Sequence, residues 1–198
     1  MTAPTSALER LIRRGSSRGQ ESGPRCELCN VPLAAQHRHL LDTEAVAVLC
    51  ACQACSLLFS RDAASAGHYR LVPRRRTRLA AVPTKDLGVP VGLAFFVLRA
   101  DGTVIAHYPS PAGATQWEVD PQAWAQVVSH CPTLGTMAPD VEALLVNTAR
   151  GAQHHWLVPI DDCLRLVALV RQTWKGLSGG NQVWPQIERF FAELSEQR

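Results

Sequence analysis

The sequence has few charged residues, few aromatic residues and no long apolar run. Only 19% of its 198 residues are Asp, Glu, Lys or Arg, and only 6% are aromatic. The formal net charge of +3 is too small to predict a nucleic-acid partner by itself. No run of about 18 apolar residues is present, so we expect no helix that spans a membrane.

The N-terminal residues also lack the pattern of a secretion signal. Arg13-Arg14 fits the start of a twin-arginine signal, but Gly, Ser, Arg, Gln and Glu follow where an apolar stretch is required. We therefore expect the protein in the cytoplasm, where thiols stay reduced. Seven cysteines in a reducing compartment indicate metal binding rather than disulfides.

Changes in composition divide the chain into four segments. Residues 1–24 are rich in Ser, Gly and Arg, which predicts a tail that is disordered or orders on a partner. Residues 25–60 hold five of the seven cysteines and are predicted to form a small metal-binding module. Residues 61–90 show little periodicity and contain the run Arg74-Arg75-Arg76, which we interpret as a linker with a solvated basic face. Residues 91–198 are predicted to form a second domain.

The second domain is predicted to be α+β, with two β-hairpins, about three helices and a sheet covered on one side. The apolar run 93–98, an Asp-Gly turn and the alternating run 104–108 predict one hairpin, and the runs 141–146 and 155–158 predict another. Helices are predicted after Asp120, over 160–174, and from about Asn181 to the end.

The predicted helix over 160–174 is nearly all apolar around Leu164, Val167, Ala168 and Val170, so we expect it to be buried. Asp161 and Asp162 near its start are interpreted as N-capping residues that also complement the helix dipole.

Two Cys-x-x-Cys pairs provide the strongest chemical signal. Cys26 and Cys29 form the first pair, Cys52 and Cys55 form the second, and 22 residues separate the pairs. Each pair can form a tight knuckle with both sulfurs facing one point, and two knuckles supply a tetrahedral set of four thiolates. This set suits Zn²⁺. The segment therefore predicts a zinc-ribbon-like module in which the metal substitutes for a core.

Three other side chains are alternative ligands for this metal. Cys50 extends the second pair to Cys-x-Cys-x-x-Cys and is either a buried spectator or an exchangeable ligand. His37 and His39 lie between the pairs, so a Cys₃His site is an alternative, although a polar Gln-His-Arg-His run is more typical of a surface. Four thiolates also fit iron, which would make the protein a rubredoxin-like electron carrier.

Other candidates for chemistry are weaker. His130-Cys131 could form a nucleophile pair, but neighbours in sequence rarely reach that geometry. His154 and His155 are adjacent in a predicted strand and therefore point to opposite faces. Cys163 is interpreted as a small core residue. The glycine-rich stretch 176–180 lacks the Walker and Rossmann spacings and is interpreted as a turn between helices.

Two parts of the sequence resemble one family of uncharacterised, mainly actinobacterial proteins. They are the cysteine segment with its His-Arg-His-Leu-Leu-Asp run, and the C-terminal run 156–163 together with 174–184. The genes of that family lie near those of high-affinity nickel–iron hydrogenases, which implies an accessory or maturation role. Rubredoxins accompany some hydrogenase assembly chaperones, but their second pair reads Cys-Pro-x-Cys, whereas this chain has Cys52-Gln-Ala-Cys55. That difference favours zinc over iron.

We therefore interpret the chain as a non-enzymatic metal-binding accessory protein. The resemblance implies a protein client, either a hydrogenase subunit or a maturation factor. Trp117 and Trp184 are candidate anchors for the client, with core packing the more typical role of Trp184. The alternatives are the rubredoxin-like electron carrier and a nucleic-acid-binding zinc ribbon, the latter disfavoured by the weak basicity and the scarcity of aromatic residues near the cysteines.

Overall fold

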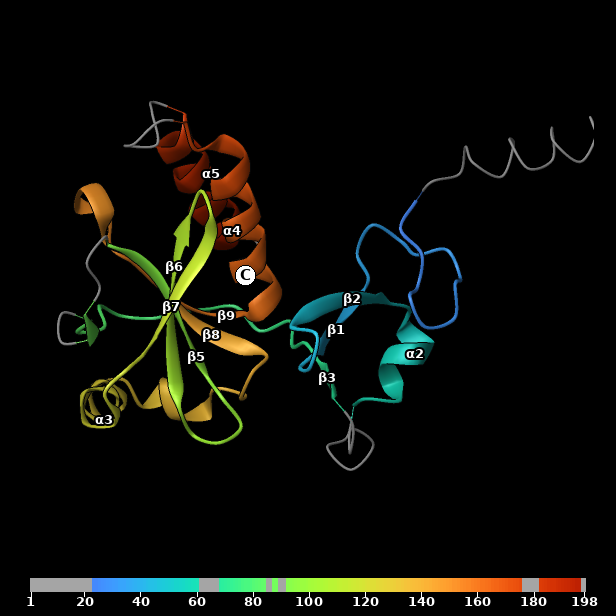
Figure 1. Cartoon of the computed structure of the whole chain (residues 1–198), viewed down its shortest axis with the longest axis horizontal. Coiled ribbons are helices and arrows are strands. Elements are labelled where there is room, and N and C mark those ends of the chain that lie inside the picture. Colours follow the sequence, from blue (N-terminus) through green and yellow to red (C-terminus); the bar gives the residue numbers. More distant parts are fainter. Residues whose placement is uncertain (1–22, 61–67, 85–86, 89–91, 176–181, 197–198) are drawn as a thin grey trace, which may run out of the picture.

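The computed structural model describes residues 23–60, 68–84, 87–88, 92–175 and 182–196. These residues form an α+β structure with two antiparallel sheets (Figure 1). The predicted tail 1–24 lies almost wholly outside the described residues, as do the glycine-rich stretch 176–180 and the expected helix cap Asn181. No helix in the described ranges is long and apolar enough to cross a membrane.

The smaller sheet has three strands, two of which belong to the cysteine-rich segment. Its strands are β1 (Arg38–Asp42), β2 (Ala47–Ala51) and β3 (Tyr69–Leu71), in the order β2-β1-β3. A turn between β1 and β2 is stabilised by Asp42, whose carboxylate accepts hydrogen bonds from the backbone N–H groups of Glu44 and Ala45, both at 3.0 Å. A short helix, α2 (Gln53–Leu57), follows β2 directly.

The larger sheet has six strands in the order β4-β9-β8-β5-β6-β7. Both predicted hairpins are confirmed: β5 (Leu93–Leu98) pairs with β6 (Val104–Ser110), and β8 (Glu142–Asn147) pairs with β9 (His154–Pro159). The outer strands are β7 (Gly113–Glu118) and β4 (Thr77–Arg78). The stretch 61–90, interpreted as a linker, thus contributes β3 to the smaller sheet and β4 to the larger one.

Helices cover the larger sheet on both faces, so the expectation of one covered face is wrong. Helix α3 (Pro121–His130) lies on one face, while α4 (Ile160–Thr173) and α5 (Val183–Glu196) lie on the other (Figure 1). Neighbouring residues of each central strand enter different cores: Phe96 and Leu144 pack with α3, whereas Phe95 and Leu145 pack with α4 and α5. Two buried faces explain why these strands are continuous apolar runs.

Helix α3 begins as predicted. The Asp120 carboxylate accepts hydrogen bonds from the backbone N–H groups of Gln122 and Ala123, at 3.0 and 2.9 Å, and Pro121 is the first helical residue.

Helix α4 is buried along one side only, which corrects the prediction of a wholly buried helix. Its buried apolar side chains are Ile160, Cys163, Leu166 and Val170, spaced by three or four residues. Ala168 is exposed, as is Arg165. Helical periodicity therefore decides which residues are buried, even in a segment rich in apolar residues.

Asp161 and Asp162 lie in the first turn of α4, where their charge complements the helix dipole as predicted, but neither is the N-cap, which is Pro159 and has no side-chain capping bond. Asp162 is buried and accepts two hydrogen bonds from Arg76, at 2.6 and 3.1 Å. The Glu142 carboxylate, also buried, pairs in the same way with Arg75, at 2.9 and 2.6 Å. The arginine run is therefore only partly a solvated face, because Arg74 and Arg75 are exposed while the guanidinium groups of Arg75 and Arg76 neutralise buried carboxylates.

A histidine in the larger sheet makes the stability depend on pH. His107 on β6 stacks on Phe95 with 4.5 Å between ring centroids. Burial, with a smaller contribution from the charge of Arg99, lowers the pKa of His107 to about 4. The folded protein therefore keeps this imidazole neutral at pH values where the unfolded chain, with a pKa near 6.5, takes up a proton.

We expect the free energy of unfolding to fall as the pH drops from about 6.5 towards 4, because protonation then favours the unfolded chain. In His107→Phe, which keeps an aromatic ring on Phe95, this fall should be smaller. Urea unfolding at pH 7.5 and pH 5 measures the difference, with His130→Ala as an exposed control. An equal loss of stability in wild type and His107→Phe would contradict the prediction.

Candidate metal centre

The first cysteine pair lies in a tight turn before β1. The backbone N–H of Cys26 donates to the carbonyl of Val31 at 2.9 Å, and the N–H of Asn30 donates to the carbonyl of Cys26 at 2.7 Å. Asn30 has a φ of 59°, in the left-handed region that asparagine tolerates better than most residues. This turn brings the side chains of Cys26 and Cys29 to the same side.

The second pair lies at the start of α2. Cys52 is the N-cap of this helix, and its Sγ accepts a hydrogen bond from the backbone N–H of Cys55 at 3.3 Å. The N–H of Ser56 donates to the carbonyl of Cys52 at 2.9 Å. The helical turn therefore places Cys55 on the same side as Cys52 and gives the sulfur of Cys52 an N–H donor.

Glu27 and Cys50 join the two knuckles. The backbone N–H of Glu27 donates to the carbonyl of Cys50 at 2.9 Å, and the N–H of Cys50 donates to the Glu27 carboxylate at 2.5 Å. Glu27 lies between the first two cysteines, and Cys50 lies two residues before Cys52. These two bonds fix the first turn against β2.

The four sulfurs of Cys26, Cys29, Cys52 and Cys55 lie within 4.8 Å of one another. Sγ of Cys29 is 3.7 Å from Sγ of Cys52. A tetrahedral ion about 2.3 Å from each sulfur separates the sulfurs by about 3.8 Å. The arrangement can therefore hold a metal ion as it stands, with Cys26 buried, Cys29 exposed and the other two half-buried.

The thiols of this group differ in acidity. Burial raises the pKa of Cys26, but the backbone N–H groups of Cys52, Cys29 and Leu28 outweigh it and bring the pKa to about 6. Hydrogen bonds with the side chains of Cys29 and Cys52 raise the pKa of Cys55 to about 12. Cys26 therefore provides a thiolate near neutral pH, whereas binding of a metal by the whole group must release protons.

The three alternative ligands gather around a different point. His39 on β1 lies directly opposite Cys50 on β2 in the strand register. His37 precedes His39 by two residues, and its Nε2 is 3.2 Å from Nε2 of His39. The ligand atoms of His37, His39 and Cys50 lie within 4.8 Å of one another and form a group separate from the four cysteines.

Asp161 touches this second group through His39, although its position near the start of α4 predicted a helix cap. Its carboxylate lies 2.6 Å from Nδ1 of His39, across 122 residues of sequence. The sequence did indicate that His37 and His39 lie together, because residues two apart in a strand project to the same face. No comparable signal pointed to Asp161, since its approach depends on how α4 packs against the smaller sheet.

The other candidates are isolated from both groups. Nδ1 of His130 lies 2.8 Å from the carbonyl of Gln126, so this nitrogen is not available to Cys131. His155 is buried, whereas His154 stacks on Phe191 with 4.7 Å between ring centroids. Cys163 is fully buried, and burial raises the pKa of its thiol. None of these belongs to a group of three or more metal-ligating side chains in the described part of the chain.

Loss of one sulfur from the four-cysteine group should weaken metal binding and destabilise the smaller sheet. We expect Cys29→Ser to lose metal to a weak chelator that leaves the wild type loaded, and to unfold at a lower temperature, because structural metal contributes on the order of 10 kcal/mol to such modules. Elemental analysis after dialysis and a thermal melt measure both effects, with Cys131→Ser as control. Equal metal retention in the two variants would refute the prediction.

Comparison with known proteins identifies one family. The model of a family described as "Family of unknown function (DUF5947)" matches residues 25–198. No curated protein and no solved structure matches the chain.

Proposed function

We propose that this chain, which belongs to the family of unknown function DUF5947, is a metal-binding accessory protein that acts through protein–protein contacts. In this proposal Zn²⁺ occupies the four-cysteine group, stabilises the smaller sheet and has no part in catalysis. The observation that carries the proposal is the convergence of four sulfurs from two knuckles, with 3.7 Å between Cys29 and Cys52. Four protein ligands complete a tetrahedral shell, as in structural zinc sites.

Exposed apolar side chains around the knuckles support the contact role. Leu28 and Val31 on the first knuckle are 40% and 43% exposed, and Leu57 and Leu58 at the end of α2 are 61% and 63% exposed. Exposed apolar side chains concentrated next to one site are typical of a surface that binds another protein. Trp117 on the outer strand β7 is 45% exposed, whereas Trp184 is half-buried with Arg150 stacked 5.0 Å from its ring centroid. Trp117 is therefore a better candidate than Trp184 for a further contact with the client protein.

The client we propose is a subunit or a maturation factor of a nickel–iron hydrogenase, and the setting is the cytoplasm. This part of the proposal rests on the family resemblance of the cysteine segment and the C-terminal runs. A reducing compartment suits it, because thiolate ligands must stay reduced to bind metal.

The hydrogenase role can be tested in a host strain that lacks this chain. We expect the hydrogenase to be inactive in that strain and active again when wild type or Cys131→Ser is supplied, but not when Cys29→Ser is supplied. Hydrogen uptake and the metal content of the purified hydrogenase measure the outcome. Full hydrogenase activity in the strain without this chain would overturn the role.

The contact surface can be tested apart from the metal. We expect Leu57→Asp combined with Leu58→Asp to retain the metal, because neither side chain is a ligand, yet to fail in restoring hydrogenase activity. Val46→Asp is the matched control, since Val46 is 61% exposed but lies in the turn between β1 and β2. Restoration by the double variant would remove the proposed surface.

The colour of the purified wild-type protein and its binding to nucleic acid distinguish the alternative functions. Iron in the four-cysteine group gives a red protein with visible absorption, which would support the electron carrier, whereas zinc gives a colourless one. A DNA or RNA mobility shift that weakens with salt would instead support nucleic-acid binding.

A further inference from the structure

We propose that His37, His39 and Cys50 form a second site, which binds a divalent transition metal with three protein ligands and leaves one position open. This site is distinct from the four-cysteine group and goes beyond the proposed function. Three features support it: the hydrogen bonds of the two imidazoles, the spacing of the ligand atoms and the hollow beside them.

The hydrogen bonds of both histidines fix where their protons lie. Nδ1 of His37 lies 3.0 Å from the carbonyl oxygen of Ala34, and Nδ1 of His39 lies 2.6 Å from the Asp161 carboxylate. A carbonyl or carboxylate oxygen only accepts hydrogen bonds, so each Nδ1 carries the proton. In each neutral imidazole Nε2 then has a free lone pair.

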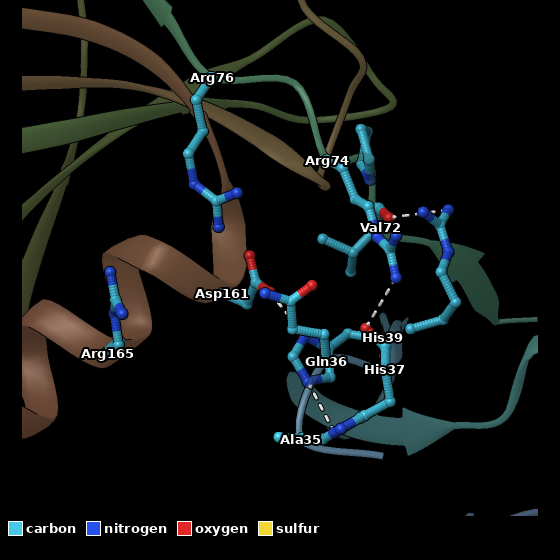
Figure 2. A pocket seen from close by; sticks show the side chains of 11 residues that line it. Ala35, Gln36, His37, His39, Val72, Arg74, Arg76, Asp161 and Arg165 are labelled. Carbon is cyan, nitrogen blue, oxygen red and sulfur yellow. Dashed lines mark hydrogen bonds and ion pairs between the residues drawn. The ribbon is translucent and has the colours of Figure 1, made fainter. Parts of the chain in front are cut away.

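These two lone pairs face each other. Nε2 of His37 and Nε2 of His39 are 3.2 Å apart, as the dashed line between the two rings shows in Figure 2. Two acceptors at this distance repel each other unless a cation lies between them or one ring takes up a second proton. A metal about 2.1 Å from each nitrogen in tetrahedral geometry separates the nitrogens by about 3.4 Å, close to the observed distance.

Cys50 supplies the third ligand. The register of β1 and β2 places it opposite His39, and opposite residues of an antiparallel pair project to the same face. Its sulfur lies within the 4.8 Å that spans the group. Two imidazoles and one thiolate suit Zn²⁺, Co²⁺ and Ni²⁺ in preference to Mg²⁺ or Ca²⁺.

Asp161 acts on this site through His39 as a positioning residue. A metal-binding histidine commonly donates its second N–H to a carboxylate, which fixes the ring and makes the other nitrogen a better ligand. The 2.6 Å contact from Nδ1 of His39 to Asp161 has this geometry. Asp161 lies on α4, so the site joins the smaller sheet to the second domain.

The open position is accessible from a hollow of about 530 Å³. His37, His39 and Asp161 line this hollow together with Arg38, Arg74 and Arg76 (Figure 2). Arg38 and Arg74 donate to the backbone carbonyls of Val72 and His37, and no carboxylate of the described residues forms an ion pair with either. Water or a small anion from this cationic hollow can therefore complete the coordination of the metal.

The test uses the full chain with zinc retained in the four-cysteine group, and Co²⁺ as the probe. We expect one further equivalent of Co²⁺ to bind, with visible bands of a four-coordinate ion and a thiolate-to-cobalt charge-transfer band. Cys50→Ser should lose the charge-transfer band, and His39→Ala should bind Co²⁺ at least about 10-fold more weakly. Asp161→Asn should weaken binding by about 10- to 100-fold and keep the charge-transfer band.

Two controls separate this site from the rest of the molecule. His68→Ala removes another half-buried histidine of the smaller sheet, and Cys131→Ser removes a distant thiol; both should bind Co²⁺ as the wild type does. Elemental analysis of each variant confirms that one zinc is retained. If Cys50→Ser releases that zinc, the effect of Asp161→Asn on Co²⁺ binding becomes the deciding measurement. The Asp161 carboxylate bonds to His39 rather than to the four-cysteine group.

Three results would overturn the site. The first is no Co²⁺ bound beyond the retained zinc. The second is unchanged Co²⁺ binding in His39→Ala and in Asp161→Asn. The third is release of one zinc for each Co²⁺ bound, detected with a zinc indicator, which would place the cobalt in the four-cysteine group. None of these outcomes bears on the hydrogenase role.

Discussion

The antiparallel register between β1 and β2 is the constraint on which both groups of ligand side chains depend. It places His39 opposite Cys50 and brings the end of β2 to the first knuckle, where Glu27 bonds to both the N–H and the carbonyl of Cys50. A shift of one residue would turn the side chains of β2 to the opposite face. The three-residue group would then lose its thiol, and Cys52 would no longer lie 3.7 Å from Cys29.

The smaller sheet is also tied to α4 and to the larger sheet through two adjacent aspartates. Asp161 faces His39, while Asp162 pairs with Arg76 in the segment that connects the two sheets. Leu41 of β1 and Val72 after β3 belong to the same apolar core as α4 and α5. Removing one partner of a buried ion pair typically costs about 3–5 kcal/mol, so the Asp162–Arg76 pair holds the connecting segment on α4.

Local patterns predicted the elements of the fold better than their contacts. The Asp120-Pro121 pair marked the start of α3, and alternation around a turn marked both hairpins, because capping and strand pleating are set by neighbouring residues. The burial of both sheet faces and the one-sided burial of α4 depend on which elements pack together, which the sequence does not state. The ion pairs of Arg75 and Arg76 join residues 67 and 86 positions apart.

The same distinction holds for the ligand groups. A Cys-x-x-Cys pair is a local signal, so the four cysteines could be assigned before their distances were known. Cys50, His37 and His39 were recognised as candidates only as alternatives to the four cysteines, whereas the structure gathers their ligand atoms in a group of their own. Their grouping follows from the strand register, and the role of Asp161 follows from the packing of α4.

Charge favours the proposed occupancy of both groups, because their metal complexes would carry opposite net charges. Zn²⁺ with four thiolates carries a net charge of −2, whereas a divalent ion with two neutral imidazoles and one thiolate carries +1. Opposite charges at short range attract, most strongly where water is partly excluded. Glu27 lies in the first knuckle of the four-cysteine group, and its bonds to Cys50 fix β2. Because β2 carries Cys50, the four-cysteine group also fixes the thiol of the three-residue group. In the proposed arrangement, the closed four-cysteine centre thus holds in place the strand that carries a ligand of the open centre.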